Sequence, residues 1–101
     1  MKLGTVIGRV TLSQNVDCLR GGRWLLVSPF ERKDFERAAK SQAISSLSRE
    51  FSLVVYDNLG ADVGQTIGYE EGREAAQPFS PPIPIDAISV ALVDHVFYSP
   101  I

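Results

Sequence analysis

Short runs of β-branched and apolar residues, each ended by glycine, asparagine or proline, recur along this 101-residue chain. The runs lie at residues 3–13, 23–30, 51–57, 65–70 and within 85–98. β-Branched residues favour strands, and glycine and proline mark the turns between them. Short strands in one small domain, residues 1–101, must bury a shared face. We therefore predict a mainly β protein, a small, closed, OB-like β-barrel.

Two segments favour helix. Residues 72–77 predict one or two helical turns before the last strand, and the four prolines at 78–84 then predict an extended loop. Residues 32–42 are charged and predict an extra helix, with an apolar stripe at every fourth position from Phe35 through Ala39 and Ala43 to Leu47. The serine-rich residues 41–50 are poor helix formers, so we expect a loop there.

Composition argues against several functions. Ten basic and twelve acidic residues give a net charge of −2, whereas proteins that grip phosphate backbones usually carry a basic excess. Cys18 is the single cysteine and His95 the single histidine, so neither a disulfide framework nor zinc-ligand spacing exists. Asp94 and His95 point to opposite faces of the predicted last strand, so Asp94 cannot orient the imidazole. We expect no enzyme, no cofactor and no metal.

Two further expectations concern location and an alternative function. No signal peptide and no apolar run of membrane-spanning length is visible, which predicts a cytoplasmic protein without a membrane partner. An OB-like barrel also raises the alternative of a nucleic-acid- or ligand-binding module. The aromatic residues are spread out and are not combined with basic residues on any one strand. We interpret Trp24 and Phe51 as core residues, which makes that alternative the weaker one.

Several segments, taken in order, resemble the EutN/CcmL family of pentameric microcompartment vertex proteins. Residues 2–10 are similar to the family's first strand, and residues 19–27 to the start of its second. Residues 54–64 match a D-x-x-G-A-G-x-G pattern, followed by residues 72–76 and by the P-I-D-A…V-A-L-V-D ending at 84–94. Asp62 departs from the pattern, because the family usually has glycine there. The segment 31–50 is also longer than in carboxysome members.

The resemblance implies a structural shell protein of a bacterial microcompartment, of metabolosome type, that forms homopentamers at the vertices of the shell. It implies hexameric or trimeric shell proteins as partners and a narrow axial pore. The small residues after the third predicted strand form the candidate pore loop: Gly60, Ala61, Asp62, Val63 and Gly64. In a ring, five copies of Asp62 would form an anionic rim. The candidate subunit interface comprises Trp24, Leu26, Ile85 and Asp86.

Overall fold

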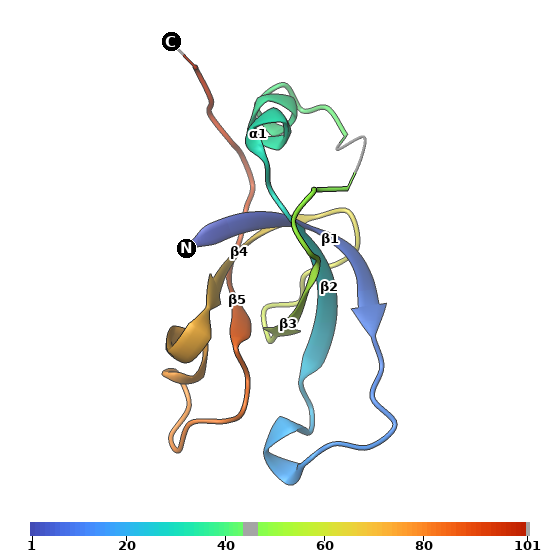
Figure 1. Ribbon diagram of the computed structural model, residues 1–101, viewed down its shortest axis with the longest axis vertical. Helices are drawn as coiled ribbons and strands as arrows, with labels where there is room; N and C mark the ends of the chain where they lie inside the picture. Colours follow the sequence, from blue (N-terminus) through green and yellow to red (C-terminus); the bar gives the residue numbers. More distant parts are fainter. Residues whose placement is uncertain (44–46, 101) are drawn as a thin grey trace.

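A closed β-barrel forms most of the molecule, as predicted (Figure 1). The computed structural model describes residues 1–43 and 47–100. Within these residues five strands close in the order β1-β2-β3-β5-β4. They are β1 (Lys2–Val10), β2 (Arg23–Pro29), β3 (Leu53–Asp57), β4 (Thr66–Glu71) and β5 (Ala87–Leu92).

The strand pairing explains how so short a chain closes. β1 pairs antiparallel with β2 and β4, and further antiparallel pairs join β2 to β3 and β4 to β5. A single parallel register position, Tyr56 opposite Ile88, closes the barrel between β3 and β5. The register of β1 against β2 shifts between Val6 and Gly8, which bends β1 around the barrel. At Gly4 an added Cβ would lie 2.5 Å from Val27 Cγ1, so this position admits only glycine.

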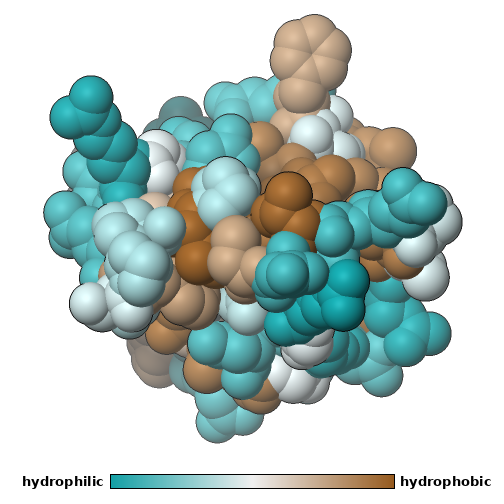
Figure 2. Space-filling view, turned by 90° about the horizontal axis from the view of Figure 1, so that it is seen from below, coloured by the Kyte–Doolittle hydropathy of each residue, from teal (hydrophilic) through white to brown (hydrophobic). Residues whose placement is uncertain are grey.

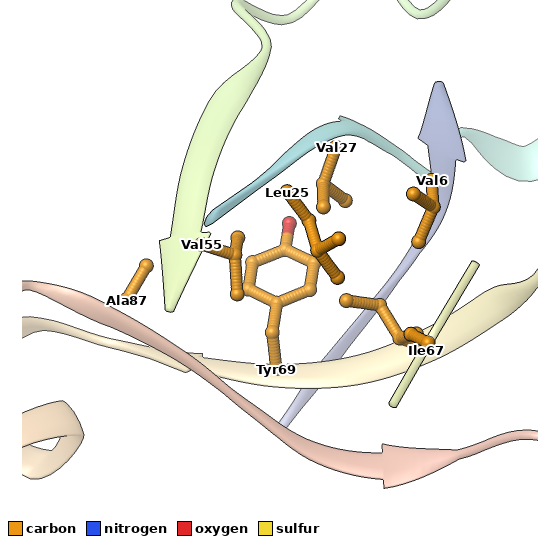
Figure 3. Packing of buried hydrophobic residues seen from close by; sticks show 8 residues of the cluster. Val6, Leu25, Val27, Val55, Ile67, Tyr69 and Ala87 are labelled. Atoms are coloured by element: carbon orange, nitrogen blue, oxygen red, sulfur yellow. The ribbon is translucent and has the colours of Figure 1, made fainter. Parts of the chain in front are cut away.

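The barrel interior is filled by alternate residues of the five strands (Figure 3). Tyr69 reaches across the interior, and the smaller side chains of the other strands surround its ring. The buried hydrophobic residues of this cluster are Val6, Leu25, Val27, Val55, Ala61, Ile67, Tyr69 and Ala87. Phe51, predicted in the core, is instead 93% exposed, because β3 begins only at Leu53.

A second apolar cluster lies against the outer wall of the barrel. Tyr56, Ala75 and Ile88 are its buried members. Trp24 packs edge-on against Tyr56 with ring centroids 5.2 Å apart, so Trp24 belongs to this outer cluster and is only half-buried. Figure 2 shows the molecule from below, with hydrophobic side chains in the middle of that face and hydrophilic ones around much of it.

One α-helix stands above the barrel, where the sequence predicts it. α1 (Arg32–Ala39) begins with a capping box, in which Glu31 and Asp34 each accept the other's backbone N–H. It ends three residues earlier than predicted, because Ser41 adopts a left-handed conformation, φ 56°. Ala43 and Leu47 are exposed, so the predicted apolar stripe does not continue. Residues 44–46 of the predicted loop lie outside the described residues.

The remaining helical turns are short. η1 (Asp17–Leu19) precedes β2, and η2 (Gly72–Ala76) precedes the proline-rich loop at the predicted place, as a 3₁₀ helix. Across the described residues no helix is both long and apolar enough to cross a membrane.

The last strand is shorter than predicted. β5 ends at Leu92, and residues 93–100 leave the barrel and run beside α1 (Figure 1). Arg32 Nε donates a hydrogen bond to the Tyr98 hydroxyl at 3.3 Å, and the Phe35 and Tyr98 rings lie 6.1 Å apart. Asp94 and His95 are therefore not in a strand, and the prediction that they point to opposite faces of the last strand was wrong. We call α1 together with residues 93–100 the appendix.

Candidate subunit interface and pore loop

The outer wall of the barrel carries an apolar stripe over β2 and β3. Leu26 and Val54 are direct cross-strand neighbours, and Val54 is 47% exposed. Gly8 lies opposite Leu26 on β1, where the missing side chain leaves Leu26 uncovered. Exposed apolar patches of this kind are typical of surfaces that a partner covers. The structure thus places Leu26, a predicted interface residue, on a surface suited to self-association.

Val54 and Gly8 were missed as members of this stripe. The signal was present, because Leu53-Val54-Val55 is apolar on both faces of its strand, as Trp24 to Val27 is. What the sequence alone does not give is the register that makes Val54 the neighbour of Leu26.

Of the other predicted interface residues, Trp24 lies on the same face of β2 as Leu26, opposite Tyr56, and continues the stripe toward the outer cluster. Trp24 and Ile85 both pack on the outer cluster around Tyr56. Asp86 is exposed at the edge of that cluster, where its carbonyl accepts the backbone N–H of Gly72 at 2.8 Å. Ile85 and Asp86 also border an apolar hollow of about 580 Å³ under η2. The structure therefore brings Trp24 and Ile85 together and leaves Asp86 at their rim.

The candidate pore loop starts from a buried carboxylate. Asp57, at the end of β3, has no exposed surface. Its two carboxylate oxygens accept three backbone N–H groups, from Leu59 at 3.3 Å, from Gly60 at 3.0 Å and from Ala61 at 3.2 Å. An aspartate that accepts hydrogen bonds from the residues just after it is the usual way to fix a turn. The first half of the loop is held by this one side chain.

Two side chains from other strands neutralise the charge of this carboxylate and provide its remaining hydrogen bonds. Arg23, at the start of β2, donates Nη1–H to Asp57 Oδ2 at 2.9 Å. The Ser89 hydroxyl, from β5, donates to Asp57 Oδ1 in a short hydrogen bond. A buried charge is tolerated only when it is paired and hydrogen-bonded, and both conditions are met here. Asp57 belongs to the family pattern, but nothing in the sequence around it marks it as the anchor of the loop.

The second half of the loop is tied to β1. Val6 accepts the N–H of Gly64 at 2.8 Å, and Gln65 Oε1 accepts the N–H of Asp62 at 2.7 Å. Ala61 is fully buried in the barrel core, whereas Asp62 and Val63 are exposed. The structure brings all five predicted loop residues into one fixed turn that presents Asp62 and Val63 outward.

The residues considered for catalysis are dispersed. Cys18 is exposed on η1, and His95 lies in the appendix with its ring 5.7 Å from that of Phe97. Within the described ranges, no group of three or more histidine, cysteine, aspartate or glutamate residues could hold a metal ion. The aromatic residues Trp24, Tyr56 and Phe79 pack on one another edge-on, so their ring faces do not form an open stacking platform.

Comparisons with known proteins give a consistent result. The model of a family described as "Ethanolamine utilisation protein EutN/carboxysome" matches residues 1–94. Among solved structures, the GrpN pentameric microcompartment shell protein from Rhodospirillum rubrum is 27% identical, with a TM-score of 0.75 over 98% of this chain and 99% of that one. CcmL from a Nostoc species is 26% identical, with a TM-score of 0.74 over 93% and 89% of the two chains.

EutN from Escherichia coli shares the fold, with a TM-score of 0.73 and 22% identity over 97% of this chain and 90% of that one. A search of curated proteins found no significant match.

Proposed function

The chain belongs to the EutN/CcmL family, and from that premise we propose that it is a structural shell protein whose homopentamers cap the vertices of a bacterial microcompartment. A shell of flat hexagonal plates closes only where five-fold units stand at its corners. A head-to-tail contact that closes after five copies provides such a unit. The protein acts by assembly and has no catalytic role.

One observation carries the proposal: the whole chain is alignable with a pentameric microcompartment shell protein, at 27% identity over 98% of its length. Almost no residue of either chain lies outside the alignment, so the similarity extends over the full length of such a subunit. The apolar stripe at Leu26 and Val54 supports the same function, since a barrel of this size has a modest core and gains stability by covering such a stripe. We expect an interface of about 2,000 Å² or more.

Native mass spectrometry tests this function most directly. We expect a particle of five 11.1 kDa subunits. The variant Leu26→Asp, which places a charge in the apolar stripe, is expected to dissociate it to monomers. Leu47→Asp is the matched control, because Leu47 is a 63% exposed leucine outside the apolar stripe, and this variant should remain pentameric. A wild-type protein that stays monomeric, or that forms six-membered rings, contradicts the proposal.

The candidate pore loop is the second part of the proposal. We place Asp62 and Val63 at the mouth of an axial pore, because the loop is rigidly held and presents both side chains outward. Five Asp62 carboxylates would then disfavour the passage of anions. Replacing Asp62 with asparagine should lower the preference for cations in conductance measurements on the pentamer. A pentamer structure with this loop far from the axis would reject the assignment.

The partners and the compartment follow from the same proposal. The pentamer is expected to bind hexameric or trimeric shell proteins in the cytoplasm and to become part of a metabolosome-type shell. Co-expression with such plates should yield closed particles, and omission of this chain should yield open sheets or tubes in electron micrographs. Closed polyhedral particles formed without it would contradict the vertex role.

A further inference from the structure

A basic hollow of about 800 Å³ lies where β1 ends and β2 begins. Its polar lining includes Arg9, Arg23 and Asn15, and its apolar lining Leu12, Trp24 and Val63. No aspartate or glutamate is among the lining residues, although acidic residues outnumber basic ones in the chain. The hollow therefore concentrates positive charge in a protein whose net charge is negative.

The two arginines of this hollow have different roles. Arg23 is fixed, because its Nη1 donates to the buried Asp57, yet its side chain remains 39% exposed and has further N–H donors. Arg9 is exposed, and in the described part of the chain no hydrogen bond or ion pair engages its guanidinium. Arg23 and Asp57 neutralise each other, so the uncompensated charge of the hollow comes from Arg9. A guanidinium with free paired donors is the group that best matches a carboxylate or phosphate.

The apolar lining indicates what else the ligand carries. Trp24, Leu12 and Val63 lie around the same space as the two guanidinium groups. Trp24 is held in place by its edge-on contact with Tyr56, and it is half-buried, so part of the indole stays available to a ligand. A purely inorganic anion would leave this surface in water, whereas an anion with a carbon skeleton would cover it.

We propose that this hollow is a binding site for a small organic oxyanion, a carboxylate or phosphate ester, held by Arg9 and Arg23 and covered on its carbon part by Trp24. Val63 belongs both to the hollow and to the candidate pore loop, so a bound ligand contacts that loop directly. The proposal goes beyond the shell function, and the site is built from the residues of one subunit.

Trp24 supplies a reporter within the site, because it is the only tryptophan of the chain. Tryptophan emission of the assembled protein is followed during titration with phenyl phosphate and with benzoate at constant ionic strength. Both probes should give saturable changes at millimolar concentrations, and the tighter of the two identifies the preferred head group. The neutral benzyl alcohol and inorganic phosphate should each bind at least about tenfold more weakly, because each lacks one of the two recognised parts.

The variant Arg9→Gln keeps a polar side chain but removes the charge, and it should weaken binding of the preferred probe about tenfold or more. Arg73→Gln is the matched control, since Arg73 is also exposed, lies on η2 and lines a different hollow. The proposal is overturned if neither probe gives a saturable change, or if Arg9→Gln binds as the wild type does. Native mass recorded on the same samples separates the two proposals, because a pentamer that does not bind contradicts only this one.

Discussion

The barrel and the appendix are built in different ways. In the barrel, every strand pairs on both sides and the interior side chains are almost completely buried. The appendix is held to the rest of the chain by isolated contacts, such as the edge-on packing of Phe35 on Phe30 with ring centroids 5.1 Å apart, and Phe97 is 94% exposed. The buried side chains that stabilise the fold therefore lie mainly in the barrel, whereas the appendix contributes little to that stability.

The largest test of this separation truncates one side chain in each region. Leu25→Ala removes a fully buried side chain and should lower the free energy of unfolding by about 2–5 kcal/mol. Phe97→Ala, at a 94% exposed position of the appendix, should change it by no more than about 0.5 kcal/mol. Urea denaturation at fixed protein concentration measures both. Equal losses would show that the appendix shares the barrel's core.

The next test compares two aspartates of the same turn. Asp57→Asn removes the charge that Arg23 and the loop N–H groups require, and should lower stability by about 2–3 kcal/mol. Asp62→Asn, at an exposed position, should stay within about 0.5 kcal/mol. Thermal unfolding of both variants checks this. An Asp57→Asn variant that loses little stability would mean that the loop does not depend on its anchor.

Alkaline pH probes the barrel alone. Burial, with the nearby Glu71 and Glu50, raises the pKa of Tyr69 to about 12. The unfolded chain loses this proton near pH 10 and the folded chain keeps it, so stability is complete below pH 10 and falls as the pH rises from 10 to 12. We expect a loss of about 2 kcal/mol at pH 12. Tyr69→Phe should flatten the profile, and an unchanged slope in that variant would contradict this origin.

The smallest expected effect lies at the base of the appendix. The backbone N–H of Arg49 donates to the Glu31 carboxylate and lowers its pKa, with Lys33 and Ser48 adding to the effect. Because the folded pKa is lowered, this contribution is present at neutral pH and is lost as the pH falls through the folded pKa. In Glu31→Gln, amide hydrogen exchange at Arg49 should accelerate while the amides of β2 stay protected. Acceleration in both places would show that the two regions open together.

The sequence predicted the barrel because the strand period and the glycine and proline turns are local signals. It located all five strands, the helix after Glu31 and the short helix η2 before the proline-rich loop, although it extended the last strand beyond its end at Leu92. It failed where the outcome depends on distant contacts. Phe51 is as apolar as a core residue, yet it lies before the first paired residue of β3. Asp94 and His95 lie after the last residue of β5.

The candidate site could be predicted from the sequence only in part, for the same reason. Gly60 and Gly64 predict a turn, and both have the positive φ that glycine allows, 89° and 93°. Its anchor could not be recognised, because the groups that make Asp57 a buried acceptor come from residues 34 positions before and 32 positions after it. Which exposed apolar residues form a stripe likewise depends on strand register.

The hydrogen bond from Ser89 to Asp57 has a consequence for the order in which the protein matures. The anchor of the turn after β3 is completed by the strand that the ribosome delivers last. A nascent chain without β5 therefore lacks one of the donors that shape this turn, and its barrel wall is still open. The fixed form of the candidate pore loop is therefore complete only when synthesis of the chain is nearly finished.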